Sequence, residues 1–187
     1  MKQRFLPLIF IALQVLPMGR ACAEKADSDK QIEIVSIKSE DDDIKQIKTF
    51  TGNVVLTQGT LVLKGSKLVL TTSPDGWQFA TLYAQSGGLA TMRQKRDGGP
   101  DLWMEGEASD KITYDQKTSV SKLFSNAKVR RLTGAKITDD AAGAYLSYSG
   151  QTEVITGANN ESGESKPGDG RVKVVIQPHN HPDGKAQ

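Results

Sequence analysis

The side chains best suited to catalysis or metal binding are scarce in this chain and poorly placed. Its one cysteine is Cys22, near the start of the 187 residues, and its two histidines, His179 and His181, lie between prolines near the end. A catalytic or metal-binding histidine needs a rigid element that orients its ring. We therefore predict no Ser-His-Asp site. We interpret the two histidines as part of a solvated tail over residues 178–187, because no further ligand accompanies them.

Carboxylates and glycines form no catalytic or cofactor motif either. The run from Glu40 to Asp43 lacks the alternating spacing and the glycine of a calcium loop. Gly134-Ala135-Lys136 lacks the spaced glycines and the following Ser or Thr of a phosphate-binding loop. Pairs of acids suited to glycoside hydrolysis come without the aromatic platform that binds sugars. The sequence therefore predicts a protein that is not an enzyme and that binds no metal and no cofactor.

Residues 1–23 have the features of a secretory signal peptide. A basic start precedes an apolar run from Phe5 to Leu16, which is shorter than the roughly twenty residues of a membrane-spanning helix. The small residues Ala21-Cys22-Ala23 then match a cleavage site. We predict cleavage after Ala23, which removes the cysteine and leaves an exported chain that folds without disulfides.

The remaining chain has the size of one compact domain, which we place at residues 24–177, and the composition, 37% hydrophobic and 25% charged, agrees with this. The signal peptide holds three basic and no acidic residues, so its removal changes the formal charge from +2 to −1. Residues of both signs are interspersed along the chain, which argues against a nucleic-acid-binding face.

Apolar and polar residues alternate from Gln31 to about Gly157, and turn residues interrupt the alternation at intervals of roughly ten. No window of a dozen residues has a helical period. The pattern predicts an all-β protein of antiparallel strands, in which one face of each strand is buried. The clearest strands are expected at residues 32–34, 54–56, 61–63, 68–70, 111–114 and 145–148.

Several of these segments resemble one another. Residues 66–70 align with 110–114 and with 144–148, and the unequal offsets indicate similar hairpins rather than a solenoid repeat. Gly52-Asn53 and Ser125-Asn126 occupy equivalent places in two further aligned segments. Because Gly and Asn tolerate positive φ, we predict that both pairs mark kinks that redirect a strand.

The buried faces are mostly aliphatic, since aromatic residues make up only 6% of the chain. We therefore expect a lightly filled interior in a sandwich, a closed barrel or a jelly roll whose two sheets splay apart. Residues 159–170 are too polar to bury a core and are predicted to form a flexible loop. Residues 171–176 then return as one more strand.

Five segments, in order along the chain, resemble the OstA-like (LptA) family of periplasmic lipopolysaccharide-transport proteins of Gram-negative bacteria. The most specific is TFTGNVVLTQG, from Thr49 to Gly59. The chain departs from the family where Ser125-Asn126 replaces a second Gly-Asn, and where residues 159–170 form a longer loop. The other segments are Ile32-x-Ile34, residues 108–114, the turn at Asn126 and residues 171–178.

The resemblance implies a single twisted, open β-jelly roll in the periplasm whose interior carries the acyl chains of lipopolysaccharide towards the outer membrane. It also implies head-to-tail joining of copies to one another and to the jelly-roll domains of an inner-membrane and an outer-membrane partner. Residues 32–37 and 172–176 would supply the two edges for this joining. An ATPase elsewhere would drive the movement, because the chain has no nucleotide motif.

The apolar face that the aligned hairpins share gives the expected lipid-binding residues. Met92 is included because it matches a position that is usually aromatic in the family. Alternation alone leaves open which face is inside, and whether these residues are simply core. The predicted lipid-binding residues are Ile32, Ile34, Phe50, Val54, Leu56, Leu68, Leu70, Met92, Ile112, Tyr114, Leu146 and Tyr148.

Basic residues near the strands have two interpretations. They meet lipid phosphates at the rim of the groove, or they protect exposed strand edges from aggregation. Two other functions also stay open, a structural adaptor of the same fold and a secreted jelly-roll protein that binds or cleaves carbohydrate. The basic residues in question are Arg93, Lys95, Arg96, Lys128, Arg130 and Arg131.

Overall fold

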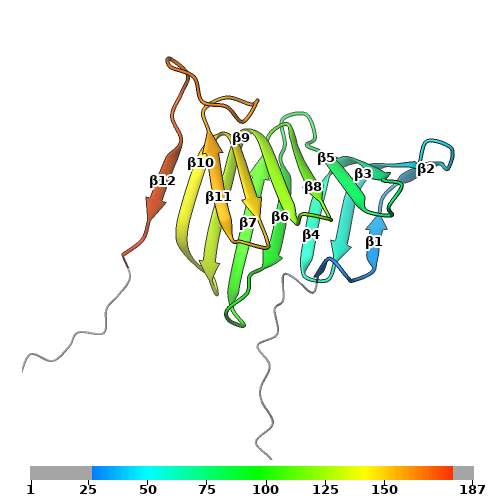
Figure 1. Cartoon of the computed structure of the whole chain (residues 1–187), viewed down its shortest axis with the longest axis horizontal. Helices are drawn as coiled ribbons and strands as arrows, with labels where there is room; N and C mark the ends of the chain where they lie inside the picture. The colour runs from blue at the N-terminus through cyan, green and yellow to red at the C-terminus, as the bar shows by residue number, and fades with distance from the viewer. Residues whose placement is uncertain (1–26, 179–187) are drawn as a thin grey trace, which may run out of the picture.

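The computed structural model describes residues 27–178, and every element defined there is a β-strand, as predicted (Figure 1). The expected signal peptide and both histidines lie outside the described residues. All strand pairs are antiparallel. The strands are β1 (Ile32–Val35), β2 (Lys38–Asp42), β3 (Ile47–Gln58), β4 (Leu61–Thr72), β5 (Gln78–Tyr83), β6 (Ala90–Lys95), β7 (Leu102–Ala108), β8 (Lys111–Asp115), β9 (Val120–Thr133), β10 (Lys136–Ser149), β11 (Val154–Ala158) and β12 (Lys173–Ile176).

The 12 strands form one hydrogen-bonded sheet that folds into two layers. The long strands β3, β4, β9 and β10 run through both layers. One half of each long strand pairs within the β5–β8 layer, in the order β2-β3-β4-β5-β8-β9-β10-β11. The other half pairs within the β6–β7 layer, in the order β1-β3-β4-β6-β7-β9-β10-β12. This is the predicted open jelly roll.

The long strands change layer at small residues. Gly52 and Asn53 have φ of 85° and 47°, and Ser125 and Asn126 have φ of 63° and 47°. The β3–β4 register shifts between Thr51 and Val54. Both predicted kinks are therefore confirmed, because positive φ bends β3 and β9 from one layer into the other.

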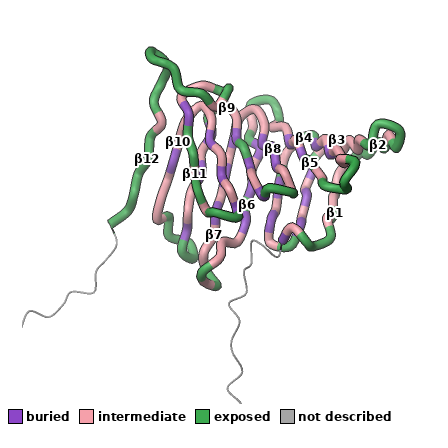
Figure 2. The backbone as a smooth tube through the Cα atoms, in the orientation of Figure 1, coloured by how far each residue is buried: buried purple, intermediate pink, exposed green. Residues whose placement is uncertain are grey.

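The aligned hairpins lie side by side in a common register. Leu68, Ile112 and Leu146 belong to one row across the β5–β8 layer, which Leu82 and Leu123 complete. All five side chains are 0% exposed, so this face is the interior (Figure 2). The sequence similarity between the hairpins thus reflects equivalent places in the core.

Small residues line the β6–β7 layer opposite this leucine row. A Cβ on Gly65 would lie 2.6 Å from the Tyr83 carbonyl oxygen and 2.8 Å from Leu82 Cγ. The layers are therefore in direct contact near the kinks. The interior is filled by its own side chains, in contrast to the light filling expected from the low aromatic content, because leucines of one layer occupy the space that glycines and alanines leave in the other. The small residues are Gly65, Ala90, Ala108, Ala127 and Gly143.

Residues 159–170, which were predicted to form a loop, contain no strand in the structure. The side-chain amide of Asn159 donates hydrogen bonds across the base of this loop, to the carbonyls of Gly170 at 2.9 Å and Lys166 at 3.4 Å. The loop returns the chain from β11 in one layer to β12 in the other.

Candidate functional site

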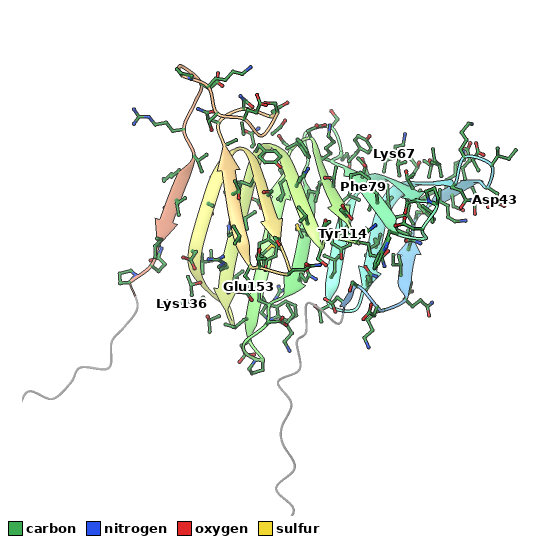
Figure 3. All side chains as sticks on the ribbon, viewed as in Figure 1. Asp43, Lys67, Phe79, Tyr114, Lys136 and Glu153 are labelled. Atoms are coloured by element: carbon green, nitrogen blue, oxygen red, sulfur yellow. The ribbon has the colours of Figure 1, made fainter. Side chains whose placement is uncertain are left out.

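The interior changes in character from the kinks to the free ends of the strands. In the β6–β7 layer, the small row near the kinks is followed by an apolar row that contains Leu56, Leu63 and Met92. The next row mixes polar with apolar residues. It contains Gln58, Leu61, Gln94, Met104, Arg131 and Asp139. We call this side, where the strand-connecting turns of the two layers face each other, the mouth. Lys136, at the start of β10, and Glu153, in the turn before β11, are both labelled at this side in Figure 3.

The structure brings all twelve predicted lipid-binding residues together in this interior. Ile32, Ile34 and Phe50 are partly buried and pack against the core at its N-terminal end. The other nine are core residues with at most 5% exposure, namely Val54, Leu56, Leu68, Leu70, Met92, Ile112, Tyr114, Leu146 and Tyr148.

Sequence reasoning missed part of the same interior. Leu82 and Met104 lie in β5 and β7, two strands that the sequence pattern did not single out. Their strands show the same period-two alternation, as in Phe79-Ala80-Thr81-Leu82, so the signal was present. The remaining missed core side chains of comparable size are Leu61, Leu63, Leu123 and Val129.

A short N-terminal segment, residues 27–30, crosses the mouth and is here called the strap. Asp27 is only 3% exposed and accepts hydrogen bonds from the Thr60 backbone at 2.8 Å and from Gln94 Nε2 at 3.2 Å. Gln58 Nε2, from the same layer, donates to the Ser28 carbonyl at 3.0 Å. Gln116 Nε2, from the β5–β8 layer, donates to the same carbonyl at 2.9 Å. The strap therefore ties the two layers together at the mouth.

Three of the six basic residues lie on the outer face of the β6–β7 layer and pair with carboxylates there. Arg93 lies 2.9 Å from Glu105 and stacks on the Trp103 ring at 4.4 Å. Glu107 lies between Arg130 at 3.0 Å and Lys128 at 3.3 Å. These pairs bridge neighbouring strands and stand on the side of the layer away from the interior.

Arg96 and Arg131 instead point to the mouth. Arg96 Nη2 lies 2.5 Å from the Glu153 carboxylate, and Arg131 Nη2 donates to the Glu153 carbonyl oxygen. Burial lowers the pKa of Arg96, but the hydrogen bond and charge of Glu153 and the proximity of Tyr148 outweigh burial and raise it overall. Arg96 thus stays charged, and the three residues form a second connection between the layers.

The family of the chain follows from comparison with known proteins. A family model described as LptA/(LptD N-terminal domain) LPS transport protein matches residues 33–154. The chain belongs to this family. It is 33% identical to the lipopolysaccharide export system protein LptA of Haemophilus influenzae over 147 residues, which cover 76% of this chain and 84% of that protein. It is 34% identical to LptA of Escherichia coli K12 over 122 residues, which cover 63% of this chain and 64% of that protein.

A solved structure supports the same fold for this LptA-family chain. The crystal structure of LptH, the LptA homologous periplasmic component of the lipopolysaccharide transport device of Pseudomonas aeruginosa, matches with a TM-score of 0.69. The match covers 81% of this chain and 99% of LptH at 22% sequence identity. The resemblance inferred from the sequence is therefore confirmed at the level of family and fold.

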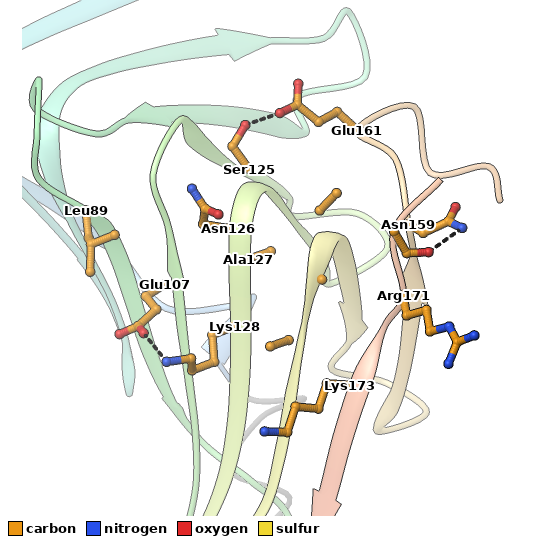
Figure 4. Close-up of a pocket in the computed structure, with 14 residues that line it drawn as sticks. Leu89, Glu107, Ser125, Asn126, Ala127, Lys128, Asn159, Glu161, Arg171 and Lys173 are labelled. Atoms are coloured by element: carbon orange, nitrogen blue, oxygen red, sulfur yellow. Dashed lines mark hydrogen bonds and ion pairs between the residues drawn. The ribbon is translucent and has the colours of Figure 1, made fainter. Parts of the chain in front are cut away.

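A separate cleft of about 660 Å³ lies outside the interior, next to the β9 kink (Figure 4). Its cations are Lys128, Arg171 and Lys173, and its anions are Glu107, which pairs with Lys128, and Glu161, which accepts a hydrogen bond from Ser125. Its wall includes residues beyond position 154, where the match to the LptA-family model ends. None of the twelve predicted lipid-binding residues lines it.

The carboxylate run of the LptA-family chain lies at the N-terminal end, in β2 and the turn that follows. Asp42 is 2.7 Å from Lys45, whose side-chain hydrogen bond lowers the pKa of Asp42, and Asp41 pairs with Lys48. Within residues 27–178, no three His, Cys, Asp or Glu side chains are grouped to hold a metal ion. The same residues contain no helix of the length and apolarity needed to cross a membrane.

Proposed function

We propose that this chain is a periplasmic carrier of lipopolysaccharide that holds the lipid acyl chains between its two layers. The observation that carries the proposal is a continuous apolar interior, closed at the mouth by polar contacts alone, in a member of a family whose relatives are named lipopolysaccharide export system proteins. The role is transport rather than catalysis. The family match also disfavours the alternative of a carbohydrate-binding or carbohydrate-cleaving protein.

Binding by this interior requires the layers to separate. The core side chains already fill the space between them, so acyl chains must take the place of contacts between layers. Each buried CH₂ group contributes about 0.8 kcal/mol, so several acyl chains compensate for the contacts that they replace. The kinks join the layers covalently, and the layers therefore part at the mouth.

A photo-crosslinking amino acid tests the face assignment in cells. We expect a crosslinker at Leu70, Met92 or Tyr114 to capture lipopolysaccharide, because these residues face the interior. Val69 and Lys67 provide matched controls, since they neighbour Leu70 on β4 and face outward. Capture at Val69 or Lys67 without capture at the inward positions would show that the lipid binds elsewhere.

We further propose that copies of the chain join head to tail. Each end of the molecule carries two edge strands, one per layer, with β1 and β2 at one end and β11 and β12 at the other (Figure 1). The sequence predicted one edge strand at each end, and the structure has a second edge strand at each end. Apolar side chains are exposed at both ends, namely Ile37 at 78% and Val35 at 59% at one end, and Ile176 at 66% and Val174 at 59% at the other.

The register of the interior supports this joint. The apolar row through Met92 begins at Ile34 in β1 and ends at Val174 in β12. Pairing of β12 with the β1 edge of a second copy would continue the row into that copy, and with it the groove. The two surfaces differ, so the contact is heterologous and need not close. The same edges would bind the jelly-roll domains of the inner-membrane and outer-membrane partners.

Removal of β12 tests the joint. We expect deletion of residues 173–187 to leave a folded, lipid-binding monomer, because Val172 still covers Gly157 and Leu146. Light scattering should show concentration-dependent oligomers for the full chain and none for the truncated chain. The variant Phe79→Ser serves as a control, since this exposed side chain lies away from both ends. Equal oligomerisation of the truncated chain would place the joint elsewhere.

A further inference from the structure

The six basic residues divide into two groups by strand alternation. On β9, Arg130 points outward and Arg131, paired with the fully buried Met104, points inward. Beyond β6, Arg96 follows the inward side chain of Gln94, while Arg93 points outward. Only 14% of the Arg96 side chain is exposed. Two arginines thus stand at the mouth, where the interior meets solvent.

The hydrogen-bonding capacity of these two arginines is incompletely used. Each makes a contact with Glu153 through Nη2, yet the Nε atoms of both are buried and have no hydrogen-bond partner among the described residues. Guanidinium groups offer several donors in a planar fork, which fits carboxylates and phosphates equally well. The arrangement is therefore an anion site in which a carboxylate of the chain itself supplies part of the ligand.

We propose that Arg96 and Arg131 bind a phosphate group of the carried lipid, which takes the place of Glu153. The proposal rests on the proposed function, because acyl chains between the layers leave the phosphorylated headgroup at the mouth. Glu153 follows the exposed residues Gln151 and Thr152 in the turn between β10 and β11, so its carboxylate has room to move away. Its release breaks a contact between the layers, and phosphate binding thus favours the separation that the acyl chains need.

The outer arginines do not fit this role. Arg93 and Arg130 pair with Glu105 and Glu107, which stand on neighbouring strands rather than on a turn. They also face away from the interior, so a lipid whose chains lie between the layers cannot reach them with its headgroup. They provide matched controls on the same two segments of chain.

The test compares two lipids with the same acyl chains, diphosphoryl lipid A and its fully dephosphorylated form, titrated into the full mature chain from detergent micelles. We expect the wild type to prefer the phosphorylated lipid by about tenfold, the scale of one or two charge-assisted hydrogen bonds. Arg96→Gln with Arg131→Gln should abolish the preference without weakening binding of the dephosphorylated lipid. Arg93→Gln with Arg130→Gln should leave it unchanged. Glu153→Gln should strengthen binding of the phosphorylated lipid more than binding of the dephosphorylated lipid.

The outcomes separate this site from the carrier function. Failure of both lipids to bind the wild type would overturn the proposed function, whereas equal binding of both would overturn only the phosphate site. Retention of the preference in the double arginine variant would also overturn it. Inorganic phosphate should not compete at millimolar concentration, because it lacks the acyl anchor, and effective competition would identify a free-phosphate site instead. If the double glutamine variant does not fold, Arg96→Lys with Arg131→Lys provides a second test. These substitutions keep the positive charges but remove the planar guanidinium groups, and they should reduce the preference for the phosphorylated lipid.

Discussion

The two long sides of the molecule connect the layers by different interactions. At the kinks, four strands pass from one layer to the other. Leucines pack directly onto glycines there, and a Cβ added to Gly65 would lie closer to Leu82 than van der Waals contact allows. At the mouth, the layers are joined through the Ser28 carbonyl of the strap, which accepts hydrogen bonds from Gln58 and Gln116, and through the ion pair of Arg96 with Glu153. One side is apolar and covalently continuous, and the other is polar and separable.

This difference indicates how the jelly roll opens. When a packed apolar contact separates, the stabilisation from burial, about 25 cal/mol per Å² of apolar surface, is lost outright. A polar contact at the surface exchanges its partner for water, at a net cost of about 0.5–1.5 kcal/mol per hydrogen bond. We therefore expect the kinks to act as the fixed side and the mouth to be the side that opens.

Truncation of a leucine near the kinks should have the largest effect. Leu123 is fully buried, and its Cδ2 lies close to Gly106. Leu123→Ala should lower the free energy of unfolding by about 2–5 kcal/mol, measured by urea denaturation, because it leaves a cavity between the layers. Leu89→Ala is the control, because Leu89 is 47% exposed and its truncation should change the free energy of unfolding little. A similar loss at both positions would mean that the kink side is not tightly packed.

Addition of one methyl group at Gly65 should have the next largest effect. The new Cβ would lie 2.6 Å from the Tyr83 carbonyl oxygen, which belongs to backbone and cannot rotate away. Gly65→Ala should therefore destabilise the protein by about 1–3 kcal/mol in the same assay. At Gly170 a Cβ would meet nothing within 4 Å, so Gly170→Ala should be nearly neutral. A neutral Gly65→Ala would contradict the close approach of the layers.

The sequence predicted those kinks that depend on backbone conformation. Gly52-Asn53 and Ser125-Asn126 adopt positive φ, which only a few residue types favour, so the bend leaves a mark in the sequence. The bends opposite them in β4 and β10 lie near Gly65 and Gly143, whose φ values are not positive. Their only mark is a small residue within an alternating strand, which is a weaker signal.

The sequence also identified the inner face but not how it is filled. The aligned hairpins selected Leu68, Ile112 and Leu146 correctly, because equivalent strands bury equivalent positions. The packing of leucines on glycines involves two layers and depends on tertiary structure. The strap was missed for the same reason, since Gln94 and Gln116 bind it from 67 and 88 residues away. Alternation alone would have separated Arg131 from Arg130, so that part of the mouth was predictable.

Loss of the strap anchor should have a moderate effect that is concentrated at the mouth. Asp27→Ala leaves the Thr60 amide and the Gln94 side chain without their acceptor, so we expect a loss of about 1–2 kcal/mol. Hydrogen exchange should accelerate in residues 27–30 and in the turn that contains Gln116. The core strands β8 and β9 should keep their protection. Asp29→Ala is the control, because Asp29 is exposed in the same segment. Uniform acceleration across the chain would show that the mouth does not open separately.

The smallest effect is expected for a contact at the mouth that joins two turns of the same layer. Asp75 and Lys117 lie 2.8 Å apart on the β4–β5 and β8–β9 turns, and both are exposed. Hydrogen bonds from Lys117 and then from Ser73 lower the pKa of Asp75 below its ordinary value of 3.8. Because the pKa is lower in the folded state, any contribution to stability exists above the ordinary value and disappears as the pH falls through the lowered value. Lys117→Gln should raise the pKa of Asp75, followed by NMR titration of its carboxyl carbon.

The same variant should leave hydrogen exchange in the strap unchanged, because this pair does not connect the layers. Faster hydrogen exchange of residues 27–30 in Lys117→Gln would mean that contacts within one layer also hold the mouth closed.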